Sequence, residues 1–267
     1  MKERLDKILV DKGFFETKNK AQAAIMAGDV KVDGKTYTKA GEGIVYKEDT
    51  VIEVKSMPFV SRGGFKLDKA VKAFRLDLGE KICLDAGAST GGFTDCMLQN
   101  GAKKVYAVDV GYGQIAWKIR TNPKVKTVER TNIKNCEPSA IYDENDELPG
   151  FCAADLSFIS LKKVLPNILK LMRPENIEIV TLIKPQFEAG RADVGKNGVV
   201  RDKKIHINII NDILDFARKI GLYPLDLTVS PIKGPAGNTE YLAYFSDKDN
   251  NAENFDVVST VENAREE

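Results

Sequence analysis

The fold is encoded most clearly in residues 83–95, which read Cys83-Leu84-Asp85-Ala86-Gly87-Ala88-Ser89-Thr90-Gly91-Gly92-Phe93-Thr94-Asp95. An apolar run that begins at Ile82 ends in an acid and a glycine-rich turn, and Phe93, Met97 and Leu98 then recur at helical spacing. This order predicts a strand, a tight turn and a helix, the opening unit of an open α/β sheet. Ligands of such sheets bind beyond the carboxyl ends of the strands, so this turn is a candidate binding site.

Two nucleotide-type ligands are compatible with such a turn. A dinucleotide fingerprint places a glycine at its middle position so that the backbone can approach a pyrophosphate, but the residue there is Ser89. S-adenosylmethionine carries no phosphate and does not need that approach, and Asp85 could hold its cationic end. The turn therefore favours S-adenosylmethionine over a dinucleotide, although glycine turns with acidic strand ends also occur without a ligand.

The strands that follow supply further contacts for this ligand. Val105–Asp109 ends in a second acid, which is suited to a ribose diol, and Asn132 is placed to contact an adenine edge. The complete predicted cofactor site consists of Asp85, Gly87, Ala88, Ser89, Thr90, Gly91, Gly92, Phe93, Asp109, Val110, Asn132, Ile133 and Asp155.

Apolar runs at residues 125–129, 151–155, 177–183, 225–229 and 239–245 predict the remaining strands. The run 177–183 is apolar almost throughout, as expected of a strand that is buried on both faces. Together they predict a mostly parallel α/β sheet of about seven strands over residues 81–246. A polar segment at residues 189–202 is long enough to be a lid or binding loop. The acidic residues 247–267 are expected to be a disordered tail.

Composition excludes several classes of function. The chain has 267 residues and a net charge of +1, so overall charge gives no nucleic-acid signal. Its four cysteines form no C-x-x-C pair, and its single histidine, His206, is expected to be a surface or half-buried structural residue. One histidine and scattered cysteines do not supply the ligands of a zinc cluster or the residues of a Ser-His-Asp triad. The charged opening residues predict no signal peptide and no run approaches a membrane span, so a cytoplasmic protein is expected.

Residues 1–58 predict a small separate module. Helical spacing begins at Leu5, Thr17 can cap a second helix, and Asp33-Gly34 is a hairpin turn signal. The pattern resembles the RNA-binding domain of ribosomal protein S4, which implies an α+β module that contacts RNA phosphates through Arg4, Lys18, Lys20 and Lys31. Charge alone does not reveal this role, since the module holds eleven basic and ten acidic residues. A solvated surface on a protein-binding module is the alternative.

Residues 59–80 predict a basic linker and helix. Gly63 and Gly64 interrupt the chain before an apolar helix face. Over residues 62–75 the charge is one-sided, with Asp68 as the single acid against five cations, Arg62, Lys66, Lys69, Lys72 and Arg75. Cationic helix faces are often merely solvated, but this one leads directly into the first strand of the sheet. Arg62 is therefore a further candidate for contact with RNA.

Two charged residues stand out because each ends a buried strand on the edge that carries the cofactor turn. These are Asp155 and Lys184, and a lysine at such a position is costly unless it is paired. Here the sequence resembles the TlyA family, whose catalytic domain is of the FtsJ type. The resemblance extends from Arg4 to about Phe245 and rests on five segments, residues 61–67, 85–94, 154–160, 183–188 and 237–240.

The resemblance implies a Rossmann-like class I methyltransferase that uses S-adenosylmethionine to methylate the ribose 2′-hydroxyl of a cytidine in ribosomal RNA. It also implies a catalytic tetrad of Lys66, Asp155, Lys184 and Glu240. Lys184 would act as the base or charge at the hydroxyl, Asp155 would orient it, and Lys66 and Glu240 would complete the hydrogen-bonded frame.

Four alternatives remain at this stage. An enzyme that methylates an exocyclic amine usually has a proline-rich turn where this chain reads Asp155-Leu156-Ser157-Phe158, and a base C5 enzyme needs a nucleophilic cysteine after a proline. An RNA-binding assembly factor with an inactive methyltransferase fold is disfavoured by the intact tetrad. Some members of the TlyA family are also labelled haemolysins, but no membrane-lytic amphipathic helix is predicted.

Overall fold

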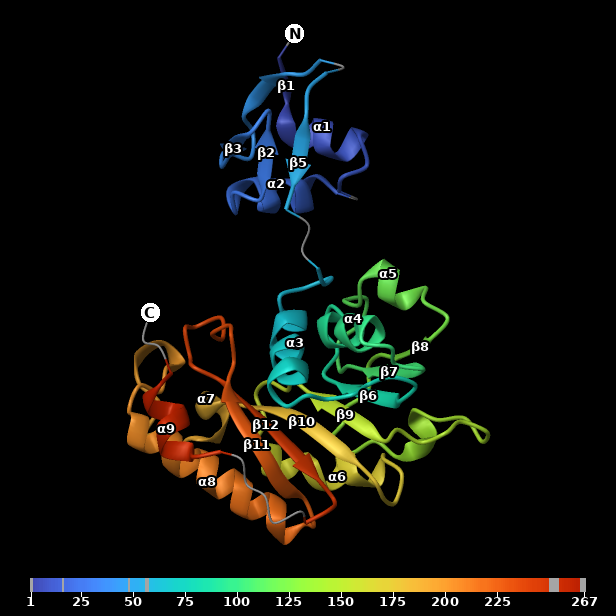
Figure 1. Ribbon diagram of the computed structural model, residues 1–267, viewed down its shortest axis with the longest axis vertical. Coiled ribbons are helices and arrows are strands. Elements are labelled where there is room, and N and C mark those ends of the chain that lie inside the picture. Colours follow the sequence, from blue (N-terminus) through green and yellow to red (C-terminus); the bar gives the residue numbers. More distant parts are fainter. Residues whose placement is uncertain (1, 16, 48, 56–57, 250–254, 265–267) are drawn as a thin grey trace. The chain divides into compact units, whose positions relative to one another are not determined.

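The computed structural model describes residues 2–15, 17–47, 49–55, 58–249 and 255–264 and divides into two compact units, Met1–Pro58 and Phe59–Glu267 (Figure 1). The first unit contains β1 (Lys2–Arg4), α1 (Leu5–Asp11), α2 (Lys18–Met26), β2 (Val30–Val32), β3 (Lys35–Tyr37), β4 (Gly43–Val45) and β5 (Ile52–Val54). β1 pairs with β4, and β2 pairs with both β3 and β5, all antiparallel.

Local signals explain the elements of this unit. The Thr17 side chain accepts a hydrogen bond from the Lys20 backbone N–H and caps α2, as predicted. Asp33 and Gly34 both adopt positive φ between β2 and β3, as the predicted hairpin turn requires. Apolar residues from both helices, β2 and β4 form one small core, which consists of Leu5, Ile8, Leu9, Ala21, Ile25, Val30, Val32 and Ile44.

The second unit is built on a seven-stranded sheet in the order β11-β12-β10-β9-β6-β7-β8. The strands are β6 (Ile82–Ala86), β7 (Lys104–Val108), β8 (Val125–Val128), β9 (Phe151–Ala154), β10 (Glu178–Ile183), β11 (Tyr223–Val229) and β12 (Tyr241–Ser246). β12 is antiparallel to both of its neighbours, and the other pairs are parallel. This confirms the predicted α/β class with a mostly parallel sheet and a small α+β unit before it.

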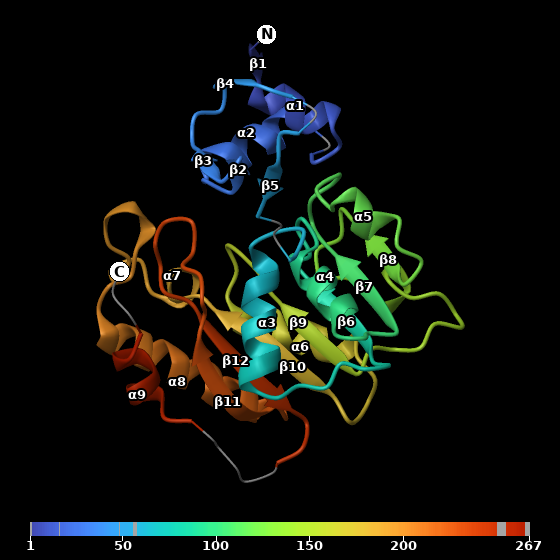
Figure 2. The same ribbon diagram turned by 45° about the horizontal axis from the view of Figure 1, so that its top comes forward.

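Helices cover both faces of this sheet (Figures 1 and 2). They are α3 (Gly63–Ala73), α4 (Gly92–Gln99), α5 (Trp117–Arg120), α6 (Leu165–Lys170), α7 (Pro185–Glu188), α8 (Lys203–Lys219) and α9 (Val257–Glu262), with 3₁₀ turns η1 (Pro138–Ala140), η2 (Leu161–Lys163) and η3 (Lys196–Gly198). Alternate residues of the central strands serve two cores: Cys83 packs with α3 and α4, whereas Leu84 packs with α6 and α8. Among the described helices, none is long and apolar enough to cross a membrane.

Two expectations are wrong in part. Residues 257–262 of the expected disordered tail form α9, because Val261 and Ala264 find an apolar surface to bury against. His206 is buried, not exposed or half-buried, since both ring nitrogens have hydrogen-bond partners inside the protein. Residues 250–254 and 265–267 of the predicted tail lie outside the described residues.

Candidate active site

The four tetrad residues meet at the carboxyl edge of the sheet. Asp155 follows β9 and Lys184 follows β10. β12 runs the other way and pairs Tyr241 with Ile183, so Glu240 at its start lies beside Lys184. Lys66 reaches the same point from the first turns of α3.

The tetrad forms a connected and largely buried ionic cluster. Lys66 Nζ lies 2.8 Å from Glu240 Oε2 and 3.3 Å from Asp155 Oδ2, and Lys184 Nζ lies 2.6 Å from Asp155 Oδ1. Each acid therefore contacts a lysine, and Asp155 contacts both. Buried charges are stable only when paired in this way.

The two lysines differ in their surroundings. Burial alone would lower the pKa of Lys66, but the carboxylates of Asp155 and Glu240 outweigh burial and raise that pKa above its usual value. Lys66 therefore remains a cation at neutral pH. Among the described residues, Lys184 contacts one carboxylate, that of Asp155, and it also donates to Ser157 Oγ at 3.0 Å.

Two neighbours of the tetrad were missed by the sequence reasoning. Ser157 holds Lys184, and Gln186 Nε2 donates to Glu240 Oε1 at 3.1 Å. Both residues lie in segments that carry the family resemblance, which was the only available signal. No spacing rule distinguishes them, because their contacts depend on how three strand ends converge.

The glycine turn between β6 and α4 has conformations and packing that require glycine. Gly87 has φ of 89°, and a Cβ there would lie 2.8 Å from the carbonyl oxygen of Asp155. A Cβ on Gly92 would lie 2.8 Å from the backbone nitrogen of Gly64. The turn therefore packs closely against the Asp155 loop and against the beginning of α3. This packing places the predicted cofactor site next to the tetrad.

A cavity of about 540 Å³ opens beside this turn. Asp109 lies in its wall, where Oδ2 accepts from the Ser89 N–H at 2.7 Å and Oδ1 accepts from the Gly111 N–H at 2.6 Å. A carboxylate has about four acceptor sites, so Asp109 retains capacity for ligand hydroxyls. Val110, Asn132 and Ile133 of the predicted set also line this cavity.

A second cavity, of about 360 Å³, contains the tetrad. It is lined by all four tetrad residues and by seven further residues predicted to bind cofactor or RNA, namely Gly87, Ala88, Ser89, Thr90, Gly92, Phe93 and Arg62. Gly87, Ser89, Asp155 and Ser157 line both cavities. A ligand in the first cavity and a second ligand among the tetrad would meet across these residues.

Asp85 and Gly91 do not line either cavity. Asp85 is fully buried, accepts from Thr94 Oγ1 at 2.6 Å, and has no hydrogen-bond partner at Oδ1 within the described residues. Burial raises its pKa to about 7. Gly91 has φ of 94° and precedes α4, so its role in the structure is conformational.

Two of the four residues predicted to contact RNA in the first unit, Arg4 and Lys18, lie around one acid, Asp6. Arg4 Nη2 lies 2.7 Å from Asp6 Oδ2, and Lys18 Nζ lies 4.0 Å from the same oxygen. The Arg4 hydrogen bonds lower the pKa of Asp6 to about 2, against the opposing effect of burial. Lys20 lies in the first turns of α2 and Lys31 is exposed on β2.

Comparison with known proteins agrees with this geometry. A model of the FtsJ-like methyltransferase family matches residues 59–246, and a model of the S4 domain matches residues 3–50. YqxC of Bacillus subtilis, named as a candidate rRNA methyltransferase, is 47% identical over 245 residues that cover 91% of this chain and 85% of the relative.

Two further matches extend over most of the chain. A Mycobacterium tuberculosis protein named 16S/23S rRNA (cytidine-2′-O)-methyltransferase TlyA is 40% identical over 90% of this chain and 88% of the relative. A solved structure from Streptococcus thermophilus, described as a candidate hemolysin, superposes with a TM-score of 0.75 at 42% identity and covers 98% of this chain and 94% of its own.

Proposed function

Because the chain belongs to the TlyA family of FtsJ-like methyltransferases, we propose that it transfers the methyl group of S-adenosylmethionine to a cytidine 2′-hydroxyl of ribosomal RNA. The observation that carries this proposal is the complete Lys66–Asp155–Lys184–Glu240 cluster at the junction of two cavities. An inactive binding protein would have no need of two buried lysines at that junction.

The first cavity suits S-adenosylmethionine. Its volume falls within the range of ordinary small-molecule sites, and Asp109 has acceptor capacity for the two hydroxyls of a ribose. Val110 and Phe158 are large apolar side chains that are 71% and 90% exposed at the rim, where an adenine ring would cover apolar surface. When bound, S-adenosylmethionine supplies an electrophilic methyl group on a sulfonium.

The tetrad then performs the proton transfer and the positioning. The tetrad would hold the ribose hydroxyl in line with the methyl group that S-adenosylmethionine would supply, with the carbon–sulfur electron pair left on sulfur. The hydroxyl proton passes to Nζ of Lys184, which must be neutral to receive it. Asp155 and Ser157 hold Nζ in position, and Lys66, which stays protonated, holds Asp155 and Glu240 together.

Methyl transfer itself tests this function. The full chain is incubated with S-adenosylmethionine labelled at the methyl group and with ribosomal RNA from a strain that lacks the enzyme. The RNA is then digested to nucleosides, and we expect the label in 2′-O-methylcytidine. Label in a methylated base would indicate a base-directed enzyme, and RNA binding with no label would indicate an inactive assembly factor.

We also propose that the first unit delivers the enzyme to its RNA, which its match to the S4 domain supports. A chain that begins at Phe59 should keep its affinity for S-adenosylmethionine and lose most of its affinity for RNA. If this shortened chain methylates the same RNA at the full rate, the first unit has another role. Because ribosomal RNA is the substrate, we propose the cytoplasm as the location, which also suits the four free cysteines.

A further inference from the structure

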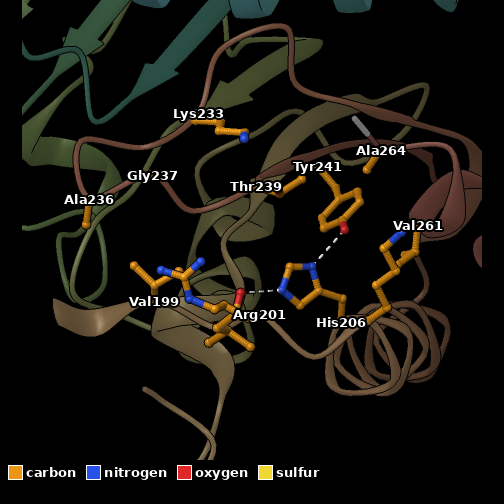
Figure 3. Close-up of a pocket in the computed structure, with 12 residues that line it drawn as sticks. Val199, Arg201, His206, Lys233, Ala236, Gly237, Thr239, Tyr241, Val261 and Ala264 are labelled. Carbon is orange, nitrogen blue, oxygen red and sulfur yellow. Dashed lines mark hydrogen bonds between the residues drawn. The ribbon is translucent and has the colours of Figure 1, made fainter. Parts of the chain in front are cut away.

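Two more cavities lie next to the tetrad, along the connection between β11 and β12. One has a volume of about 720 Å³ and shares Ile232 and Lys233 with the tetrad cavity. The other, of about 380 Å³, shares Lys233, Thr239 and Ala264 with the 720 Å³ cavity (Figure 3). Lys233 lines all three cavities, so they adjoin one another at this connection.

The lining of these two cavities carries charge of one sign. Lys69 comes from α3, Arg201 and Lys203 from the segment that begins α8, and Lys233 from the β11–β12 connection. Among the described residues that line them, none is aspartate or glutamate. The whole chain has 40 basic and 39 acidic residues, so such a one-sided lining departs from the average of the sequence. A groove lined by one sign of charge concentrates ligands of the opposite charge.

The walls of the groove are held by hydrogen bonds of His206 and Asn238, and Lys203 Nζ donates to the Glu262 carbonyl oxygen at 3.4 Å. His206 contacts the Val200 carbonyl oxygen through Nε2 at 2.9 Å and the Tyr241 hydroxyl through Nδ1 at 2.7 Å (Figure 3). Since a carbonyl oxygen only accepts, Nε2 carries the proton and Nδ1 accepts from Tyr241. Burial lowers the pKa of His206, which favours this neutral form.

Asn238 completes the wall. Its side chain accepts from the Val200 N–H at 3.0 Å and donates to the Gly198 carbonyl oxygen at 2.9 Å. The segment before α8 and the β11–β12 connection are thereby joined, so Arg201 and Lys233 approach one cavity from two elements fixed to each other (Figure 3). A preorganised wall of this kind loses little entropy when it binds a ligand.

We propose that the groove lined by Lys69, Arg201, Lys203 and Lys233 binds backbone phosphates of the RNA strand next to the methylated nucleotide. This inference rests on the proposed function. The groove offers cations and few aromatic side chains, so it suits phosphate contacts, which position a strand without reading its sequence. It fixes the direction in which the substrate strand leaves the tetrad.

The test compares exposed cations inside and outside the groove. Lys69→Gln and Arg201→Gln remove two groove charges from exposed side chains. Lys170→Gln and Lys219→Gln remove two exposed charges from α6 and α8 as the matched control. RNA affinity is measured against salt concentration with an RNA that the wild-type chain methylates, and affinity for S-adenosylmethionine is measured in parallel.

Each phosphate contact to a single strand contributes about 0.7 to the slope of log affinity against log salt, so the groove double variant should lose about 1.4. The control should lose nothing, and affinity for S-adenosylmethionine should be unchanged in both. Equal slopes for the groove variant, the control and the wild type would overturn the proposal. So would a groove variant that loses affinity for inorganic phosphate alone but not for RNA, since the groove would then serve a small anion. If the wild-type chain methylates no RNA, the proposed function itself is wrong. That outcome differs from equal salt slopes, which would contradict the groove proposal alone.

Discussion

Asp6 in the first unit and Asp155 in the second each contact two cations, but the cations are presented in opposite ways. The side chains of Arg4 and Lys18 around Asp6 are 51% and 54% exposed. Those of Lys66 and Lys184 around Asp155 are only 12% and 8% exposed. The acids differ much less, since the side chains of Asp6 and Asp155 are 0% and 19% exposed, so the main difference lies in the cations.

The difference in exposure of the cations indicates two different roles for lysine and arginine beside an aspartate. Exposed cations anchored to a buried acid keep their hydration and can meet a large polyanion by exchange of counterions. A buried lysine meets little water, so its few polar partners fix the position of Nζ. That position decides where a reacting hydroxyl and its proton can lie. We therefore expect the exposed cluster to tolerate changes of shape that the buried cluster does not.

The largest effect is expected at Lys184. Lys184→Ala should lower the turnover of methyl transfer by about a hundredfold to ten-thousandfold, the usual contribution of general base catalysis, while both substrates still bind. Lys184→Arg should not restore it, because a guanidinium stays protonated at any working pH and has another shape. Single-turnover kinetics and thermal unfolding measured together check this expectation.

A structural role for Lys184 predicts a different pattern. The Ala variant would leave Asp155 with one cation fewer, the melting temperature would fall, and activity would decline only as far as folding does. A well-folded Lys184→Ala protein with near-normal turnover would end the catalytic assignment. Asp155→Asn should be similarly damaging, and the double variant should be far from additive if the pair acts as a unit.

Asp109 is an intermediate case, since it is an acid held by backbone N–H groups and not by a lysine. Asp109→Ala should weaken S-adenosylmethionine by about 1.5–3 kcal/mol, the contribution of hydrogen bonds to a charged group. Calorimetry measures this, and Asp143→Ala offers an exposed acid of the same unit as a control. Unchanged affinity in a folded Asp109 variant would refute the ribose contact.

Asp6 should affect stability and not chemistry. Its pKa is lowered to about 2 in the folded protein, mainly by Arg4, whereas an unfolded aspartate titrates near 3.9. The ionised form is therefore favoured by folding, and this stabilisation is present above about pH 4 and is lost as the pH falls toward 2. Asp6→Asn should lower the melting temperature of the first unit at pH 7 and have no such effect near pH 2.

The transition of the first unit can be identified by comparison with the chain that begins at Phe59. Asp11→Asn, an exposed acid at the end of the same helix, is the matched control and should leave melting unchanged at both pH values. A deficit for Asp6→Asn that persists undiminished at pH 2 would mean that shape, and not charge, stabilises the cluster.

The two clusters also show which parts of the fold and of the candidate site could be predicted from the sequence. The β6–turn–α4 unit could be predicted, because an apolar run and glycines at fixed offsets have local physical causes. The placement of Glu240 beside Lys184 could not be predicted, because it depends on the antiparallel register that pairs Ile183 with Tyr241. The tetrad was proposed from family resemblance and the pairing of Lys184 with Asp155 from their strand ends, whereas the two ion pairs of Lys66 became visible only in three dimensions.

Burial was the property least accessible from sequence. Asp6 was not singled out, since an acid on an amphipathic helix is usually solvated, yet its carboxylate is covered by Arg4, Lys18 and Gln22. Charge count suggested a disordered tail, although Val257, Val261 and Ala264 recur at helical spacing and α9 packs on α8. In both cases contacts that composition does not reveal decided the outcome: the side chains around Asp6, and the packing of α9 on α8.

The smallest effect, and the most direct test of the contrast, is expected at Lys18. Lys18→Gln should reduce the slope of log RNA affinity against log salt by about 0.7 to 0.9, the loss of one phosphate contact. Lys18→Arg should leave the slope as it is, because a phosphate on an exposed surface requires charge and accepts either shape. The same substitution at Lys184 is expected to abolish turnover, so one Lys→Arg exchange has opposite outcomes at the exposed and the buried cluster. If Lys18→Arg lowers RNA affinity as far as Lys18→Gln does, the exposed cluster also depends on shape, and the distinction drawn from the exposure of its cations is wrong.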